Sequence, residues 1–269
     1  MSALPGRLVL LGHPVAHSAS PRFQNAALRA AGIPLVYEAL DVPLDALDAT
    51  LDALALVHAA GNVTIPHKEA VAARCAELSP LAKRCGAVNV FWHQAGRLFG
   101  DNTDVAGVDV VARALLQGRC EGARVALIGA GGAAAAVLCA VEGWEGARVR
   151  LYNRHMIRAE RLAERFAGFT DVSQSIDEAI RDANLVVNAT PTGLADDSHP
   201  VAISALPNGA AVFDLVYRPE ETSWVREARE AGHRAADGEG MLLEQGALAF
   251  ERWFGQAPDR GAMWRAMHW

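Results

Sequence analysis

A glycine- and alanine-rich turn between a predicted strand and a predicted helix constrains the fold of this 269-residue chain more than any other feature. Arg124 to Ile128 is an apolar run of strand length, and an alanine-rich helix is predicted to extend to about Val141. The turn between them, Gly129-Ala130-Gly131-Gly132-Ala133-Ala134, has the pattern G-x-G-x-x-A. Glycine permits the tight turn and lets a pyrophosphate approach the helix N-terminus. The pattern therefore predicts a Rossmann-like unit that binds a dinucleotide.

The residues after the next predicted strand indicate which dinucleotide is bound. This strand, Ala147 to Tyr152, ends in Asn153 and Arg154, whereas an NAD site usually has an acidic residue there. Arg158 follows four residues later, and two guanidinium groups suit a 2′-phosphate through charge-assisted hydrogen bonds. These residues predict NADP as the cofactor. The alternative is that both arginines only form the polar face of an arginine-rich helix.

The stretch Asn62-Val63-Thr64-Ile65-Pro66-His67-Lys68 predicts a polar site at the end of a strand. The residue before a proline is extended, and a helix often starts at or after the proline. We therefore expect a strand from Asn62 to Ile65 and a helix from Lys68 to Leu78. Open α/β sheets bind ligands at the carboxyl ends of their strands, and a structural cation is unusual at a helix N-terminus. Lys68 is thus a candidate for proton transfer, and the alternative is a solvated surface lysine.

Two serines precede the first predicted helix. Ser18 and Ser20 lie two residues apart in a segment that we expect to be extended, so their hydroxyls point to the same side. Such a pair can bind a carboxylate or a polyol. The alternative is that they only cap the helix, because Ser20 before Pro21 is typical of an N-cap.

Two further polar residues are candidates for the same site. Asn89 is an amide within a predicted strand, Gly86 to Trp92, and a buried amide must bind either backbone groups or a ligand. A hairpin leads from this strand to Asp101-Asn102-Thr103-Asp104. Thr103 or Asp104 can cap the helix that follows, so an N-cap is the alternative to a catalytic role for Asp104.

The order of the predicted elements indicates two α/β domains. The alternating strands and helices of the first hundred residues predict a mostly parallel sheet. We expect residues 1–103 and 239–269 to form a substrate-binding domain, and residues 104–238 to form the Rossmann-like domain. The glycines of Gly238-Glu239-Gly240 are expected to act as part of a hinge. A helix from Met241 to Phe254 and a tail rich in Trp and Met then return to the first domain.

Composition excludes several classes of partner. The net charge is −6 without a long run of one sign, which argues against nucleic acid or an anionic membrane as the main partner. No stretch has the length of a transmembrane helix, and no leader is recognisable before Leu8. The four cysteines form no C-x-x-C pair and no secretory signal is recognisable, so we expect reduced thiols in a cytoplasmic protein and no metal site. We expect a monomer or a homodimer.

Taken together, six motifs in this order resemble the shikimate dehydrogenase family over nearly the whole chain. The serine motif, the lysine motif, the Asn89 strand, the motif ending in Asp104, the glycine turn with its arginines, and the C-terminal helix each have a counterpart in that family. They are Gly12 to Pro21, Asn62 to Lys68, Gly86 to Asn89, Asp101 to Asp104, Gly129 to Ala133 with Asn153, Arg154 and Arg158, and Gly240 to Leu242 with Gln245.

The resemblance implies reversible, NADPH-dependent reduction of 3-dehydroshikimate to shikimate in aromatic amino-acid biosynthesis. Lys68 and Asp104 would form the catalytic pair, with Lys68 the better proton donor. The implied substrate ligands are Ser18 and Ser20 for the carboxylate, Thr64, Asn89, Asp104 and Gln245 for the ring hydroxyls, and Tyr217 as an assisting residue. The implied cofactor ligands are the glycine turn, the Asn153-Arg154-Arg158 clamp, and Leu215 and Gly238 near the nicotinamide.

Two alternatives have different sequence signatures. A quinate/shikimate dehydrogenase that uses NAD would place an acidic residue after the second Rossmann strand, where this chain has Asn153 and Arg154. A non-catalytic NADP-binding sensor would be indicated by the loss of Lys68 or Asp104, and both are present. One departure from the family concerns the cofactor: His155 stands where threonine usually follows the Asn-Arg pair.

Overall fold

The computed structural model describes residues 4–268 and divides into two compact units. Met1–Ala3 and Trp269 lie outside the described residues. Met1–Ala3 belong to the stretch expected to carry no leader, and Trp269 is the end of the tail. The first unit comprises Met1–Asp104 and Leu242–Trp269, and the second comprises Val105–Met241. Both boundaries between the two units fall inside helices, namely α5 (Asp104–Leu115) and α10 (Glu239–Phe254).

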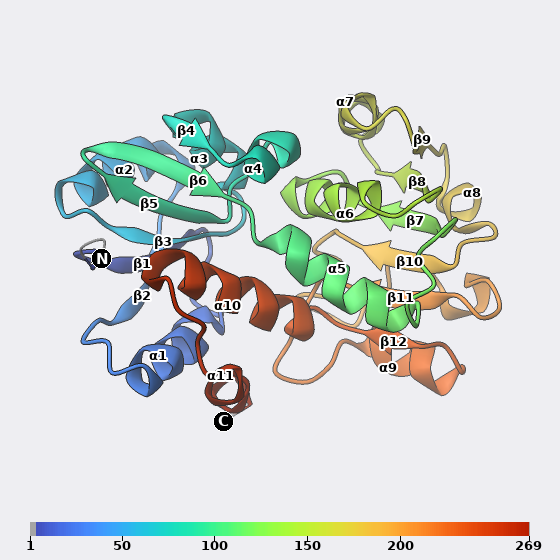
Figure 1. Ribbon diagram of the computed structural model, residues 1–269. Helices are drawn as coiled ribbons and strands as arrows, with labels where there is room; N and C mark the ends of the chain where they lie inside the picture. Colours follow the sequence, from blue (N-terminus) through green and yellow to red (C-terminus); the bar gives the residue numbers. More distant parts are fainter. Residues whose placement is uncertain (1–3, 269) are drawn as a thin grey trace. The chain divides into compact units, whose positions relative to one another are not determined.

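The first unit contains a mixed six-stranded sheet in the order β2-β1-β3-β5-β6-β4 (Figure 1). β1 pairs in parallel with β2 and β3, whereas β5 pairs antiparallel with β3 and with β6. The short β4 pairs in parallel with β6. The strands are β1 (Leu8–Gly12), β2 (Tyr37–Asp41), β3 (Ala60–Val63), β4 (Glu77–Leu78), β5 (Val90–Gln94) and β6 (Arg97–Asp101).

Helices cover both faces of this sheet because successive side chains of a buried strand point to opposite faces. Leu8 and Leu10 of β1 pack with residues of α1, α10 and α11, whereas Val9 and Leu11 pack with residues of α2 and α3. Met263 and Met267 are buried in the first of these clusters, so the prediction that the tail packs on the first unit is confirmed. The helices are α1 (Ser20–Ala30), η1 (Leu44–Ala46), α2 (Leu47–Leu56), α3 (Lys68–Arg74), α4 (Pro80–Cys85) and α11 (Arg260–Met267).

Two predicted boundaries around Lys68 are wrong. β3 ends at Val63, so Thr64 and Ile65 lie in a turn, where the Thr64 N–H donates to the carbonyl of Leu11. The helix that begins at Lys68 ends at Arg74 and does not reach Leu78. The chain after α3 instead pairs with β6, because the N–H of Ala76 donates to Leu98 and β4 follows directly. Pairing with a distant strand outweighs the local helical pattern here.

Two further predictions in the first unit need correction. Ser20 is the first residue of α1 and not its N-cap, which is Ala19 without a side-chain hydrogen bond. The strand predicted from Gly86 starts at Val90, because Gly86 has φ +61° and closes the short helix α4. A left-handed residue after a helix is typically glycine, since other residues carry a steric cost there. Asn89 therefore lies one residue before β5 and not inside it.

The second unit contains a fully parallel six-stranded sheet in the order β12-β11-β10-β7-β8-β9. This order, 3-2-1-4-5-6 counted from β7, is that of a Rossmann fold, so the predicted architecture is confirmed. The strands are β7 (Arg124–Ile128), β8 (Arg148–Tyr152), β9 (Thr170–Val172), β10 (Leu185–Asn188), β11 (Ala211–Asp214) and β12 (Ala235–Ala236).

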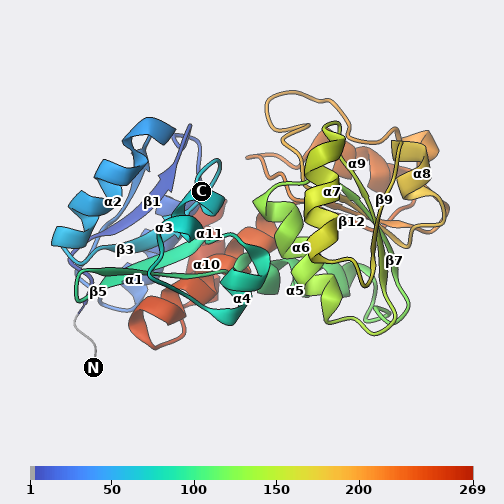
Figure 2. The same ribbon diagram turned by 90° about the horizontal axis from the view of Figure 1, so that it is seen from above.

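Helices flank the parallel sheet on both sides (Figure 2). They are α6 (Gly132–Glu142), α7 (Met156–Arg165), α8 (Ile176–Ile180), η2 (Ile203–Ala205) and α9 (Ser223–Glu230). The strand predicted over Ala210 to Tyr217 ends at Asp214, so Leu215 and Tyr217 lie in the loop beyond it. None of the four cysteines, all of which lie among the described residues, forms a disulfide. Among the described helices, none combines the length and apolar character needed to cross a membrane.

Candidate active site

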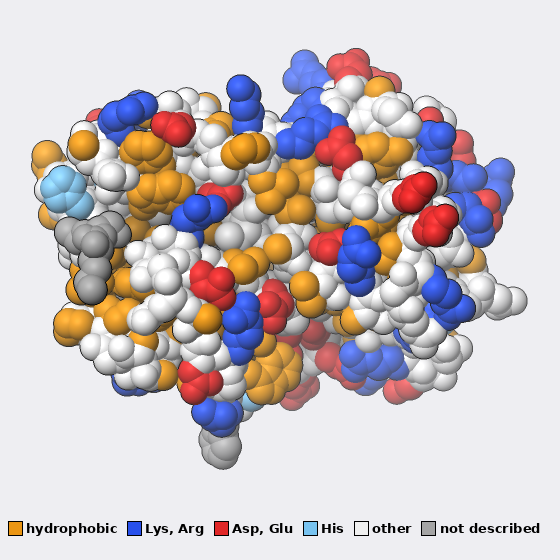
Figure 3. Space-filling view, viewed as in Figure 1, with side chains coloured by type: hydrophobic (Ala, Val, Ile, Leu, Met, Phe, Trp, Pro, Cys, Tyr) orange, Lys and Arg blue, Asp and Glu red, His pale blue; other side chains and the backbone are white. Residues whose placement is uncertain are grey.

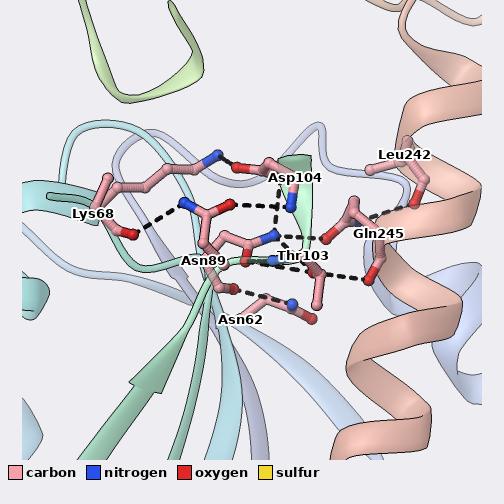
Figure 4. A network of polar contacts seen from close by, with 9 residues as sticks. Asn62, Lys68, Asn89, Thr103, Asp104, Leu242 and Gln245 are labelled. Atoms are coloured by element: carbon pink, nitrogen blue, oxygen red, sulfur yellow. Dashed lines mark hydrogen bonds and ion pairs between the residues drawn. The ribbon is translucent and has the colours of Figure 1, made fainter. Parts of the chain in front are cut away.

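Lys68 and Asp104 form an ion pair within the first unit. Each is the first residue of a helix, α3 and α5 respectively. The Lys68 Nζ lies 2.5 Å from Asp104 Oδ2, with side-chain exposures of 16% and 5%. Figure 4 shows the lysine reaching across to the carboxylate from the opposite side of the site. The alternative of a solvated surface lysine is therefore wrong for this structure.

The amide of Asn89 organises the centre of the site (Figure 4). Its Nδ2 lies 2.8 Å from Asp104 Oδ1, 3.0 Å from Thr103 Oγ1 and 3.1 Å from Gln245 Oε1. Its Oδ1 accepts the backbone N–H of Thr103 at 2.7 Å. Asn89 is 2% exposed, so this one amide joins the start of α5 to the C-terminal helix α10. Asp104 thus accepts hydrogen bonds on both of its carboxylate oxygens, from Lys68 and from Asn89.

Three residues that support this centre, Tyr37, Asn62 and Thr103, were not predicted from the sequence to play this role. The hydroxyl of Tyr37 donates to Asn62 Oδ1 at 2.7 Å, and Asn62 Nδ2 donates to the carbonyl of Asn89 at 3.0 Å. The Thr103 hydroxyl donates to the carbonyl of Gln245 at 3.0 Å. The available signal for Asn62 was an amide within the buried strand β3, the same signal that identified Asn89.

The hydroxyl candidates lie at the carboxyl end of β1. The Thr64 methyl group packs so closely on Gly12 that a Cβ at that glycine would lie 2.4 Å from it. The Ser18 Oγ accepts the backbone N–H of Ser20 at 3.2 Å, so Ser18 stabilises the start of α1. Ser20 makes no cap of its own and is 5% exposed. Thr64 therefore lies against the carboxyl end of β1, whereas Ser18 and Ser20 lie at the start of α1, the helix that follows this strand.

His67, to which the sequence assigned no role, fixes the start of α3. The ring is fully buried, and its Nε2 lies 2.6 Å from the carbonyl of Val42. A carbonyl only accepts, so Nε2 donates this hydrogen bond. Nδ1 has no hydrogen-bond partner among the described residues. His67 thereby attaches the residue before Lys68 to the segment that follows β2.

The glycine turn of the second unit has the geometry that a nucleotide needs. Gly129 has φ +117°, and a Cβ there would lie 2.7 Å from the carbonyl oxygen of Ala189. Gly131 is extended and precedes α6, and a Cβ at this position would meet no atom within 4 Å. A phosphate can therefore approach the backbone at the helix N-terminus, where the macrodipole favours anions. Among residues 4–268, no group of three or more His, Cys, Asp or Glu side chains could hold a metal ion.

The clamp candidates lie beside this turn. The N–H of Gly129 donates to the carbonyl of Tyr152 at 2.8 Å, which brings the end of β8 next to the glycine turn. Arg154 precedes α7 and Arg158 lies in its first turn. Both are exposed, and neither has an ion pair within the described part of the chain. Asn153 donates to the carbonyl of His155 at 2.9 Å. Both guanidinium groups are thus available to an anionic ligand.

The remaining candidates, Leu215, Tyr217 and Gly238, belong to the loops of the second unit. The N–H of Gly238 donates to Val216, and a Cβ at Gly238 would lie 2.5 Å from the carbonyl oxygen of Leu215. The close approach of the Leu215 backbone therefore explains why residue 238 is a glycine. Gly240 is the second residue of α10 and Gly238 directly precedes this helix, and the role of the two glycines in a hinge stays a prediction. Tyr217 lies in the second unit, whereas the other substrate candidates lie in the first.

A partly buried carboxylate next to Gly238 predicts a pH-dependent stability. Burial raises the pKa of Asp237 from 3.8 to about 6, and the charges of Glu239 and Asp214 act in the same direction. The N–H of Glu239 and the charge of Arg229 oppose this shift. Because the folded protein holds the proton more tightly than the unfolded chain, stability falls as the pH rises from about 4 to about 6.

We expect Asp237→Asn to raise the free energy of unfolding by about 1–2 kcal/mol at pH 7.5 and by almost nothing at pH 4. Asparagine keeps the oxygen that accepts the Glu239 N–H at 3.1 Å but carries no charge to bury. Urea unfolding of both proteins at the two pH values measures the difference. Glu220→Gln, at an exposed position, is the control. A gain of equal size at both pH values would contradict the assignment.

Three family models match most of the chain. Residues 10–91 match the shikimate dehydrogenase substrate binding domain. Residues 111–195 match the model described as shikimate / quinate 5-dehydrogenase. Residues 238–268 match the shikimate 5′-dehydrogenase C-terminal domain.

Individual relatives match over almost their full length. The chain is 42% identical to the shikimate dehydrogenase (NADP(+)) of Symbiobacterium thermophilum, over 94% of this chain and 90% of the relative. It is 44% identical to the protein of the same name from Thermus thermophilus, over 96% of this chain and 95% of the relative. A crystal structure of shikimate 5-dehydrogenase from Thermus thermophilus with NADP(H) and shikimate superposes with a TM-score of 0.86 and 41% identity. This match covers 97% of this chain and 98% of that chain.

Proposed function

The chain belongs to the shikimate dehydrogenase family, and from this premise we propose that it catalyses the reversible, NADPH-dependent reduction of 3-dehydroshikimate to shikimate. The observation that carries the proposal within the molecule is the Lys68–Asp104 pair, largely buried and held by Asn89. A cation and a carboxylate in this position supply the proton chemistry that ketone reduction requires. The activity places the protein in the biosynthesis of aromatic amino acids.

Bound NADPH supplies the hydride that reduces the ketone. The ketone oxygen gains negative charge as hydride arrives, and the Lys68 ammonium group donates a proton to it. Asp104 is the weaker candidate for donor, because its two carboxylate oxygens already accept from Lys68 and from Asn89. Its carboxylate instead holds the lysine in place. General acid help of this kind contributes roughly 10²–10⁴-fold to the rate.

The substrate would be bound by hydroxyl and amide groups of the first unit. Ser18 and Ser20 would bind the carboxylate of the substrate from the start of α1. Ring hydroxyls would be bound by Thr64, Asn89, Asp104 and Gln245, three of which already share hydrogen bonds. Asn89, Asp104 and Gln245 satisfy one another through these hydrogen bonds, so substrate binding would exchange internal hydrogen bonds for substrate hydrogen bonds. We assign Tyr217 an assisting role from the second unit.

The cofactor would be bound by the second unit. The pyrophosphate would lie against Gly129, Ala130, Gly131, Gly132 and Ala133, where Gly131 leaves open space. Asn153, Arg154 and Arg158 would bind the adenosine ribose and its 2′-phosphate, and Leu215 and Gly238 would lie near the nicotinamide. We further propose that the protein works in the cytoplasm as a monomer or homodimer. Nucleic-acid and membrane partners are not expected, because the net charge is −6 and the chain has no long run of one sign.

Initial rates with shikimate and with quinate, each with NADP and with NAD, test the proposal. We expect the highest kcat/KM for shikimate with NADP. The second candidate is a quinate/shikimate dehydrogenase, which the description of the family model for residues 111–195 supports. This second function requires that quinate be turned over with NAD at a rate comparable to that of shikimate with NADP. No turnover in any of the four combinations would leave a nucleotide-binding protein without this activity.

A further inference from the structure

A cavity lined by arginines lies at the amino ends of β7 and β8 in the second unit. Its volume is about 220 Å³, and four arginines line it together with Asp171. The arginines are Arg124, Arg148, Arg150 and Arg181. In Figure 3, Lys and Arg side chains gather at the edge of this unit near which Figure 1 places α8 and β9. The chain as a whole carries a net charge of −6, so this cluster of positive charge is opposite in sign to the net charge of the chain.

Strand register places three of these side chains on one face of the sheet. Arg124 of β7 pairs directly with Arg148 of β8, and Arg150 lies two residues further along β8. Residues two apart on a strand point to the same face, which is here the face that α8 covers. Arg181 follows the last residue of α8 and completes the group. Like charges directly opposite each other on neighbouring strands are destabilising, so the arrangement is costly without a compensating anion.

The protein itself satisfies only part of this charge. Asp182 forms ion pairs with Arg150 at 2.5 Å and with Arg124 at 3.5 Å. Arg148 donates only to the neutral carbonyl of Gly168, at 2.9 Å. The side chain of Arg181 has no hydrogen bond or ion pair among residues 4–268.

Two carboxylates, Asp171 and Asp182, therefore face four guanidinium groups. Glu178 of α8 does not supply a third, because it does not line the cavity and forms no ion pair among residues 4–268. We propose that this cavity binds a small anion bearing a phosphoryl group, of which orthophosphate and pyrophosphate are the simplest examples. Planar guanidinium groups bind phosphate oxygens through paired N–H donors, and most donors of Arg148 and Arg181 are unused.

The cavity is distinct from the cofactor site. The glycine turn lies at the carboxyl end of β7, whereas Arg124 is the first residue of that strand. Four residue steps along a strand separate the two ends by about 13 Å. Arg154 and Arg158, the proposed clamp for the 2′-phosphate, also follow the carboxyl end of β8. The cavity is smaller than the roughly 300–1,000 Å³ typical of drug-sized ligands, so it suits a phosphate and not a nucleotide.

Calorimetric titration with pyrophosphate and with orthophosphate, at constant ionic strength, tests the proposal. We expect saturable binding of one anion per cavity in the unmodified protein. The variant Arg148→Gln/Arg181→Gln should weaken that binding at least tenfold while its affinity for NADPH stays within twofold. The matched control is Arg226→Gln/Arg234→Gln, which removes two exposed arginines from the same unit and should leave anion binding within twofold.

The remaining outcomes each decide against the site. An absence of saturable binding in the unmodified protein overturns it, as does undiminished binding in Arg148→Gln/Arg181→Gln. Binding that is lost only in Arg154→Gln/Arg158→Gln assigns the anion to the cofactor clamp instead. Citrate bound as tightly as pyrophosphate overturns the phosphoryl class. Arg181→Gln alone removes no described hydrogen bond or ion pair of the fold, so its several-fold loss of affinity can be measured even if the double variant folds poorly.

Discussion

Replacement of Lys68 by alanine should reduce kcat by roughly 10²–10⁴-fold while KM for shikimate changes by less than a few-fold. The ammonium group lies 2.5 Å from a carboxylate that is 5% exposed, so it is fixed in place before substrate arrives. A group that donates its proton as hydride arrives acts mainly in the transition state, and its loss lowers kcat and kcat/KM together. Steady-state kinetics in the direction of shikimate oxidation, with NADP saturating, measure both constants.

The sequence provides a matched control, because Lys83 is the only other lysine among the 269 residues. It lies exposed on α4, so Lys83→Ala should leave both constants unchanged. Removal of Lys68 leaves the Asp104 carboxylate buried with Asn89 as its remaining side-chain donor, which costs stability. Unaltered NADPH binding would show that the Lys68→Ala protein is folded. A large rise in KM with kcat preserved would make Lys68 a binding residue and contradict its role as proton donor.

The Rossmann unit was predictable because its local signals agree with each other. Gly129 must be glycine in the folded chain, since it has φ +117° and lies against the Ala189 carbonyl. The same residue marks the turn in the sequence, and the strands on both sides are apolar runs of the expected length. The short strand β9 (Thr170–Val172) escaped prediction, because three residues carry no periodicity of their own.

The site of the first unit was predictable residue by residue but not as a network. Lys68 and Asp104 are 36 positions apart, and Asn89 and Gln245 are 156 apart, so no local pattern links them. The resemblance to a family identified all four residues, yet the sequence left open whether Asn89 bonds backbone or ligand. In the folded chain its oxygen accepts a backbone N–H, whereas its nitrogen faces the candidate substrate groups.

One prediction followed the local helical pattern at a place where the chain instead pairs with a distant strand. The helical pattern after Lys68 continues to Leu78, but the chain leaves the helix at Arg74 because β4 pairs with β6. His67 is a related case. Its neighbour in the fold is the carbonyl of Val42, 25 positions away, so its role in fixing α3 has no signature near Lys68.

The cofactor preference gives the second large effect that we expect. Arg154→Ala/Arg158→Ala should raise KM for NADP by about 10- to 100-fold and leave kinetics with NAD nearly unchanged. NADP differs from NAD only by its 2′-phosphate, and a hydrogen bond to a charged group is worth about 1.5–3 kcal/mol. Both arginines are exposed, so solvent screening places the combined effect below the sum of two such bonds. Initial rates with each cofactor at saturating shikimate give the ratio.

Arg161→Ala is the matched control, because Arg161 is exposed on α7 one turn beyond Arg158. If the arginines were only the polar face of α7, all three substitutions would leave the NADP constants unchanged. An equal loss with NADP and NAD would instead assign Arg154 and Arg158 to a part that both cofactors share, such as the pyrophosphate. Asn153→Asp provides the converse test, since an acidic residue at the end of β8 should favour the free ribose hydroxyls of NAD and repel the 2′-phosphate. If Asn153→Asp lowers the ratio of kcat/KM with NADP to kcat/KM with NAD, the adenosine ribose must lie at the end of β8.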